Sequence, residues 1–204
     1  MTIVYLIRHS MQLRENGINN SFDDSQMINE KTILSVEGEE KAKTLSELDE
    51  LQNIDIIYSS GYVRAKGTAK YIASKNNLDI NIDNRLNERK LGNLEELKKL
   101  GNKYNHTFTE EQLLDSNLKN IDGENMIEVN KRMSSFMDEI INNYKDKRIV
   151  IVSHGASMRF YLMNYCILNK DIKLEYNGNI LDFSSPCIIK LTFDNNKLRN
   201  IENI

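Results

Sequence analysis

The sequence predicts an α/β protein with a mostly parallel sheet. The first indication is an alternation of short apolar runs with helix-like segments, which is typical of βαβ units. The runs expected to form strands cover residues 3–8, 54–59, 79–83 and 148–153. The second indication is the Asp194-Asn195-Asn196 turn between residues 186–193 and 197–201, which predicts an antiparallel hairpin at the sheet edge.

Helical spacing of apolar residues predicts the segments between these strands. Ser35 is expected to cap a first helix, whose apolar stripe consists of Ala42, Leu45, Leu48 and Leu51. Ser60 is expected to cap a second helix, 62–74, with Arg64 in its first turn. The third helix is the longest and is expected to cover 124–144. Its inner face is expected to consist of Ile127, Met133, Met137 and Ile140. A helix over 158–166 follows the last strand of the parallel set.

The remaining segments are expected to be loops within a single domain, 1–204. Residues 10–32 are polar, and residues 86–92 form a short loop that holds Glu88. The stretch from about 93 to 122 has mixed charges and weak periodicity, which predicts an insertion or lid. His106 falls in this stretch, where surface exposure is expected and contact with a substrate is the alternative.

Composition excludes several classes of partner. The net charge of −3 provides no basic surface for nucleic acid or an anionic membrane. No apolar run is long enough for a signal peptide or a membrane span. The two cysteines, Cys166 and Cys187, have no zinc spacing and are expected to be buried thiols of a cytoplasmic protein.

Common cofactor and nucleophile motifs are missing from the sequence. It contains no GxGxxG after the first strand, no GxxxxGK and no GxSxG. Two of its three histidines, His9 and His154, instead follow directly on predicted strands. The carboxyl ends of parallel strands line the ligand crevice of an open α/β sheet, so these two imidazoles are expected to share a site.

The polar residues near these strand ends suit phosphoryl transfer. A neutral imidazole can attack phosphorus, and guanidiniums such as those of Arg8 and Arg64 bind phosphate oxygens in bidentate fashion. Glu88 can supply the proton that a leaving alkoxide needs, provided its pKa is raised, and can then act as a base toward water. Taken singly, each residue also has an ordinary structural explanation, such as a hydrogen-bonded buried histidine or a surface charge.

Taken together and in order, these segments resemble the histidine phosphatase superfamily, the phosphoglycerate-mutase-like proteins. The resemblance runs along nearly the whole chain and rests on Leu6-Ile7-Arg8-His9, Leu34-Ser35 with Gly38 and Ala42, Tyr58-Ser59-Ser60 with Arg64-Ala65 and Thr68-Ala69, Leu86-Asn87-Glu88 with Gly92, Gly123-Glu124 with Glu128 and Arg132, and Val152-Ser153-His154-Gly155.

The resemblance implies a three-layer α/β/α sandwich and assigns roles to the candidate residues. His9 would be the phosphorylated nucleophile and Glu88 the proton donor. The phosphate pocket would consist of Arg8, Arg64 and His154, with Ser10 and Gly155 as additional contacts. The substrate would be a small phosphorylated molecule, and neither metal nor cofactor is implied.

Two departures from the family pattern concern substrate recognition. Ser10 and Met11 stand where the family usually has glycine and then glutamate or glutamine. Ser10 is expected either to narrow the pocket or to donate a hydrogen bond to phosphate. Glu15 replaces an asparagine of the family, with Asn16 one residue later. An inward carboxylate at position 15 would repel phosphate, so we expect either that Glu15 points outward or that the loop is shifted.

The sequence and its resemblance lead to three functional hypotheses. A phosphomonoesterase is favoured, because the modest insertion leaves the phosphohistidine accessible to water. A phosphoglycerate-mutase-type phosphotransfer is the first alternative. A weakly active protein that binds phosphate esters is the second, and it is motivated by Ser10 and Met11.

Overall fold

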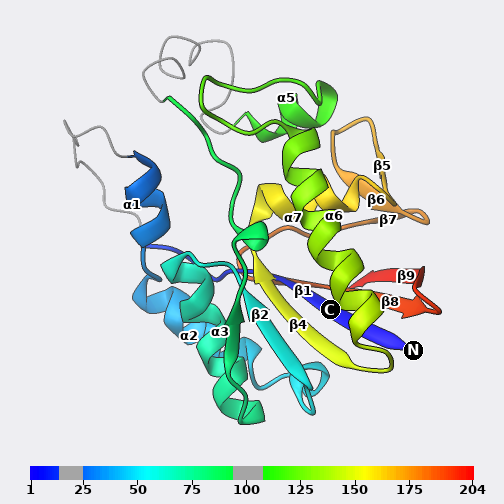
Figure 1. Cartoon of the computed structure of the whole chain (residues 1–204). Coiled ribbons are helices and arrows are strands. Elements are labelled where there is room, and N and C mark those ends of the chain that lie inside the picture. Colours follow the sequence, from blue (N-terminus) through cyan, green and yellow to red (C-terminus); the bar gives the residue numbers. More distant parts are fainter. Residues whose placement is uncertain (14–24, 94–107) are drawn as a thin grey trace.

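The computed structural model describes residues 1–13, 25–93 and 108–204 (Figure 1). Its main sheet has six strands in the order β3-β2-β4-β1-β8-β9. The bounds are β1 Thr2–Arg8, β2 Ile56–Ser59, β3 Ile80–Ile82, β4 Arg148–Ser153, β8 Cys187–Asp194 and β9 Lys197–Asn203. The pairs β1–β4, β4–β2 and β2–β3 are parallel, whereas β8 pairs antiparallel with both β1 and β9. The predicted α/β class and the antiparallel edge hairpin are confirmed.

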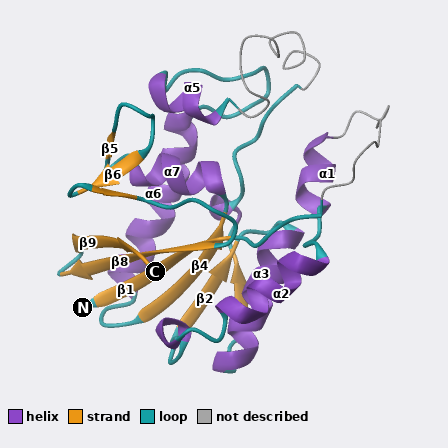
Figure 2. Cartoon of the chain, turned by 180° about the vertical axis from the view of Figure 1, so that it is seen from behind, coloured by secondary structure: helices purple, strands orange, loops and turns teal. Residues whose placement is uncertain are grey.

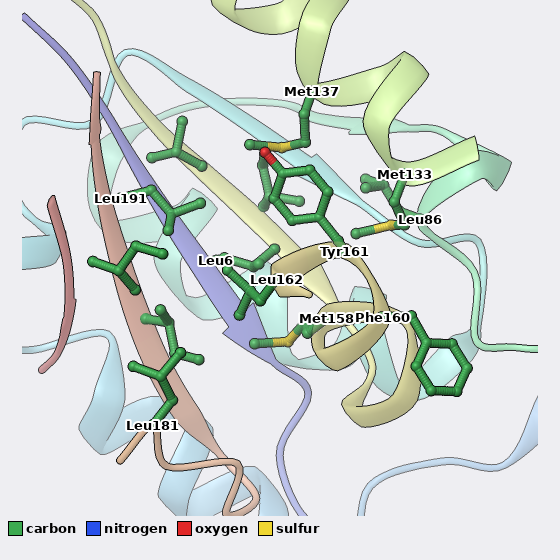
Figure 3. Packing of buried hydrophobic residues seen from close by; sticks show 14 of the residues in the cluster. Leu6, Leu86, Met133, Met137, Met158, Phe160, Tyr161, Leu162, Leu181 and Leu191 are labelled. Carbon is green, nitrogen blue, oxygen red and sulfur yellow. The ribbon is translucent and has the colours of Figure 1, made fainter. Parts of the chain in front are cut away.

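Helices cover both faces of this sheet, which gives three layers (Figures 1 and 2). One face carries α2 (Val36–Leu45) and α3 (Val63–Asn76), and the other carries α6 (Met126–Asn143) and α7 (Gly155–Leu162). Side chains of a strand alternate between its two faces. Alternate residues of β1 therefore enter separate cores: Val4 and Leu6 pack toward α6 and α7, and Tyr5 and Ile7 toward α2 and α3. Figure 3 shows Leu6 among the methionines and aromatic rings of the first core.

Two predicted helices differ from the structure in their apolar faces. Ser35 caps α2 as expected and accepts a hydrogen bond from the Gly38 N–H. That helix ends at Leu45, and a 3₁₀ turn, η1 (Asp49–Leu51), follows, so Leu48 is 38% exposed rather than part of a buried stripe. In α6, Met133, Met137 and Ile140 are buried as predicted, but Ile127 is 48% exposed because it lies in the first turn, at the end of the core.

Three elements were not predicted. A short helix, α1 (Ser25–Lys31), lies within the expected polar loop 10–32. A small sheet consists of β5 (Ile167–Leu168), β6 (Leu174–Tyr176) and β7 (Asn179–Ile180). A 3₁₀ turn, η2 (Asn84–Leu86), precedes the loop that holds Glu88. These elements are too short to carry a clear hydrophobic period, which is why the sequence pattern does not reveal them.

The expected lid is only partly described. It contains α5 (Thr109–Leu114), whereas His106, like Glu15 and Asn16, lies outside the described residues. Both cysteines are buried free thiols, as predicted. Among the described residues, no helix has the length and apolar character needed to cross a membrane.

The strand order places one crevice at the centre of the sheet. β1 and β4 are parallel neighbours, yet the helix that follows β1 in the crossover to β2 covers one face and the helix that follows β4 covers the other. Such a switch point opens a cleft at the carboxyl ends of the two strands. The loops that carry His9 and His154 meet there, and the His9 N–H donates to the Ser153 carbonyl over 3.0 Å.

Candidate active site

His9 and His154 share one site, as the sequence predicts. Their ring centroids lie 5.0 Å apart in an edge-to-face arrangement. Nδ1 of His9 lies 2.7 Å from the carbonyl oxygen of Ser10. Because a carbonyl can only accept a hydrogen bond, Nδ1 of His9 must carry the proton. Its Nε2 therefore carries a lone pair in place of a proton, which is what a nucleophilic imidazole requires.

The surroundings of His9 keep the ring neutral. Burial lowers its pKa to about 3, with the positive charge of Arg64 as the second cause. The bond to the Ser10 carbonyl and the more distant Glu88 act in the opposite direction but are outweighed. At neutral pH the lone pair of Nε2 is thus present in essentially every molecule.

Arg64 connects the two histidines. It lies in the first turn of α3, and its buried guanidinium is directed at the crevice rather than into solvent. Its Nε–H donates to Nε2 of His9 over 3.0 Å, and Nη2 lies 3.2 Å from Nδ1 of His154. Nη1 donates to the carbonyl oxygen of Asn29 in α1. All three nitrogens of the guanidinium therefore have acceptors.

His154 continues this chain of hydrogen bonds. Since its Nδ1 accepts from Arg64, its Nε2–H donates to the Ser60 hydroxyl, 2.8 Å away. The Ser60 hydroxyl in turn donates to the side-chain oxygen of Asn87 over 2.9 Å. Burial, and next the proximity of His9, hold the pKa of His154 well below its ordinary value. His154 is fully buried and does not line the cavity described below.

The prediction that Ser60 caps α3 was wrong. The N-cap residue of α3 is Tyr62, which makes no side-chain capping bond. The Ser60 hydroxyl accepts a bond from the Tyr62 N–H over 3.2 Å and holds His154 in place. Neither this contact nor the participation of Asn87 follows from the sequence pattern, because both depend on how η2 packs against the strand ends.

Glu88 lies at the N-terminus of α7. Its carboxylate accepts from the N–H groups of Ser157 (3.2 Å), Ala156 (3.4 Å) and Arg89 (2.9 Å). The start of α7 at Gly155, rather than at residue 158 as expected, brings the Ala156 and Ser157 donors to the site. A helix N-terminus stabilises an anion in this position.

The pKa of Glu88 is lowered, not raised. Burial alone would raise it, but the positive charge and N–H bond of Arg89 outweigh burial, with a further contribution from Arg64. Proton donation by Glu88 was expected on condition that this pKa is raised. In the free protein Glu88 is instead a carboxylate at neutral pH, because three N–H donors and nearby guanidiniums favour its charged form.

Arg8 and Gly155 lie against each other and line the same cavity as His9. Nη1 of Arg8 donates to the carbonyl oxygen of Phe183, whereas its Nε is buried and has no hydrogen-bond partner in the described part of the chain. A Cβ atom built on Gly155 would lie 3.1 Å from that Nε. Gly155 thus leaves the space that the guanidinium occupies.

Ser10 does not face the site, which corrects both expectations for its side chain. Its hydroxyl is fully buried and donates to the carbonyl of Gly38 over 2.7 Å. Its N–H donates to the Thr68 hydroxyl over 2.9 Å. The close approach of α2 fixes this direction, since a Cβ on Gly38 would lie only 2.0 Å from the Met11 carbonyl oxygen. Ser10 therefore anchors the loop after β1 and contributes no wall to the cavity.

A cavity of about 840 Å³ opens in front of His9. The predicted residues that line it are His9, Arg8, Arg64, Glu88 and Gly155. Arg159 of α7, which was not predicted, also lines the cavity. Its position one turn after the His154-Gly155 pair is the sequence feature that could have indicated it. Among the described residues, no group of three or more histidines, cysteines and carboxylates forms a metal site.

This cavity combines a neutral ring nitrogen with several guanidiniums and one carboxylate. The cations attract an anion, the imidazole lone pair can bond to an electrophilic centre, and the carboxylate can exchange a proton. Such a set of groups suits the transfer of a negatively charged phosphoryl group.

Both the sequence and the fold are similar to those of known proteins. The sequence model of the histidine phosphatase superfamily (branch 1) matches residues 4–202. Phosphoserine phosphatase 1 of Hydrogenobacter thermophilus is 28% identical over 137 residues, which are 66% of this chain and 64% of that protein. The match thus spans just under two thirds of that relative's length. A probable phosphoglycerate mutase of Citrobacter koseri is 29% identical over 168 residues, 78% of this chain and 72% of the mutase.

A solved structure supports the fold. A mycobacterial glucosyl-3-phosphoglycerate phosphatase superposes with a TM-score of 0.68 at 19% identity, and the match covers 93% of this chain and 89% of that one. At this identity the likeness speaks for the fold alone. The family model covers nearly the whole sequence, and the chain therefore belongs to branch 1 of the histidine phosphatase superfamily.

Proposed function

We propose that the protein is a phosphomonoesterase that hydrolyses a small phosphorylated metabolite through a phosphohistidine on His9, without metal or cofactor. One observation carries the proposal: the Ser10 carbonyl fixes the proton on Nδ1, which leaves Nε2 of a neutral ring in a cavity lined by Arg8 and Arg64. His154 completes this phosphate site indirectly, because it orients the Arg64 guanidinium.

In the first step, Nε2 of His9 bonds to phosphorus while the bond from phosphorus to the leaving oxygen breaks. Arg8 and Arg64 bind the phosphoryl oxygens and offset the negative charge of the transition state. Arg64 must turn its Nε–H from His9 to the phosphate, which frees the lone pair for attack.

Glu88 delivers the proton that the leaving alkoxide takes up. The free carboxylate is ionised, but an incoming phosphate brings negative charge beside it and offsets the guanidiniums that lower its pKa. Substrate binding therefore raises the proton affinity of Glu88, and the proton comes from solvent or from a phosphate monoanion.

In the second step, water attacks the phosphohistidine. The oxygen of the water bonds to phosphorus while the Glu88 carboxylate takes a proton from the water. The bond between phosphorus and Nε2 of His9 breaks in the same step. Inorganic phosphate leaves, and His9 returns to its neutral state.

A mutase-type transfer is the second candidate, because one of the relatives is described as a probable phosphoglycerate mutase. The two candidates share the first step and differ in the acceptor of the phosphoryl group. The name of another relative, a phosphoserine phosphatase, favours water as the acceptor.

The test is a screen of phosphorylated metabolites with EDTA present, in which phosphate release and 3-phosphoglycerate isomerisation are measured in parallel. We expect hydrolysis that persists in EDTA and is abolished by His9→Ala, together with an acid-labile phosphate on the quenched native enzyme. Isomerisation well above hydrolysis would support the mutase. Turnover unaffected by His9→Ala would indicate a protein that only binds phosphate esters in this cavity.

A further inference from the structure

A second cavity, of about 570 Å³, adjoins the active-site cavity. Thr109 and Arg159 line both cavities and therefore stand where the two meet. Apolar walls of the second cavity come from α5 and from the chain in and around the small sheet, with Leu113, Leu174 and Leu181 among them. A leaving group attached to a phosphoryl group beside His9 can extend past Arg159 into this space.

Among the described residues, the guanidinium of Arg159 forms no ion pair, although the charges of Glu88 and Glu110 act on it. It lies face-on to the ring of Phe183, 4.4 Å from the ring centroid. Within residues 1–13, 25–93 and 108–204, no acceptor forms a hydrogen bond with this guanidinium. Burial lowers the pKa of Arg159 and the positive charge of Arg8 lowers it further, and both outweigh the opposite effect of Glu88 and Glu110. Partial burial of a cation without an ion-pair partner costs free energy, and an anionic ligand would offset that cost.

Phe183 holds two guanidiniums side by side. Its carbonyl accepts from Arg8, and its ring supports Arg159. A Cβ atom on Gly155 would meet both groups, at 3.1 Å from Nε of Arg8 and 3.2 Å from Nη1 of Arg159. Two like charges at such close range repel unless anions lie against both. The guanidiniums of Arg8 and Arg159 therefore suit a ligand with two negatively charged groups, one at each arginine.

Building on the phosphatase activity proposed above, we propose that Arg159 binds a carboxylate on the leaving group, so that the preferred substrates are phosphomonoesters of small carboxylic acids. A guanidinium accommodates a carboxylate through two parallel hydrogen bonds. A singly charged carboxylate suits this cavity better than a second phosphate dianion, because Glu110 and Asp182 in its lining offset the positive charges of Arg159 and Lys173.

Binding to the His9→Ala variant tests this assignment without any turnover. Calorimetry compares two matched pairs of ligands: phosphoserine with phosphoethanolamine, and 3-phosphoglycerate with glycerol 3-phosphate. The first member of each pair carries a carboxylate that the second lacks. We expect at least one pair to show tenfold or greater preference for the carboxylate-bearing member. Adding Arg159→Gln should weaken binding of that member by about 10- to 100-fold and leave its partner within twofold.

Two further variants control for charge and geometry. Arg199→Gln removes the same charge from β9, where Arg199 pairs with Asp194, and should change no affinity. Arg159→Lys keeps the charge but loses the planar fork, so it should retain only part of the preference. Equal losses for both members of a pair would place Arg159 on the transferred phosphate and overturn the proposal, as would the absence of a carboxylate preference in both pairs. Preferential binding without hydrolysis of any ester by the native protein would overturn the proposed function and still support the role of Arg159.

Discussion

The Nε–H of Arg64 donates to Nε2 of His9 over 3.0 Å, so the free site holds its own nucleophile in a hydrogen bond. The same guanidinium reaches His154 and the Asn29 carbonyl. A phosphate that enters the cavity offers this guanidinium a more strongly charged acceptor. Substrate binding should therefore also free the lone pair of His9 from its hydrogen bond with Arg64.

Arg64→Lys should separate charge from geometry at this position. A lysine keeps one positive charge but cannot contact His9, His154 and a phosphate oxygen with one planar group. We expect kcat to fall by about 10²- to 10³-fold on any accepted ester, with a smaller change in KM. Steady-state kinetics provide the measurement.

Arg85→Lys is the matched control, because Arg85 forms ion pairs with Asp83 and Glu139 and does not line the active-site cavity. It should retain kcat within about twofold, as expected for a partly exposed ion pair. A similar small loss for Arg64→Lys would mean that position 64 contributes charge alone.

Glu88→Gln should affect substrates according to their leaving group. A glutamine cannot supply a proton, and loss of a general acid typically costs 10²- to 10⁴-fold. We expect a loss of this size for an alkyl phosphate. An aryl phosphate such as p-nitrophenyl phosphate has a stable leaving anion, so the first step should be nearly unaffected and phosphohistidine should accumulate. Rapid-quench measurement of bound phosphate tests this, and equal losses in the first step for both esters would contradict proton donation by Glu88.

The buried histidines predict a loss of stability in mild acid. The pKa of His9 is about 3 in the folded protein and 6.5 ordinarily, so between these values the unfolded chain binds a proton that the folded chain does not. The unfolding free energy should therefore fall as pH falls below 6.5. At pH 5 the contribution of His9 is about 2 kcal/mol, and that of His154 has the same sign.

Urea denaturation at pH 7.5 and pH 5 measures this change. His9→Asn should reduce the difference between the two pH values by about 2 kcal/mol. A comparison of pH 7.5 with pH 8.5 serves as the control, because neither histidine titrates there. If the native protein were equally stable at pH 5 and pH 7.5, neither ring could be held neutral by the fold.

The sequence predicts those parts of the site that depend on strand ends. A continuous apolar run before His9 and another before His154 suffice to place both rings, because parallel neighbours end at one edge of the sheet. The position of Arg64 follows in the same way from the start of the helix after β2. Residues whose role depends on packing between loops could not be predicted. Asn87 and Phe183 act through contacts to segments far away in the chain, and no local pattern records such contacts.

The error over Ser10 has a similar cause. A family-level comparison of one position suggests that a side chain there enters the pocket, but the direction of that side chain depends on α2. The backbone of Gly38 lies against the chain at Met11 and presents its carbonyl to the Ser10 hydroxyl. The structure therefore assigns Ser10 to loop anchoring rather than to phosphate binding.

Ser10→Ala tests this assignment directly. Removal of the hydroxyl deletes a buried hydrogen bond of 2.7 Å to the Gly38 carbonyl, which should lower the free energy of unfolding by about 1 kcal/mol. KM should stay within about twofold, because the hydroxyl points away from the cavity and cannot contact a bound ester. Thr44→Ala is the control: its hydroxyl bonds to the Glu40 carbonyl on the exposed surface of α2, where such a bond contributes little. A tenfold rise in KM for Ser10→Ala without loss of stability would instead place that hydroxyl on the phosphate.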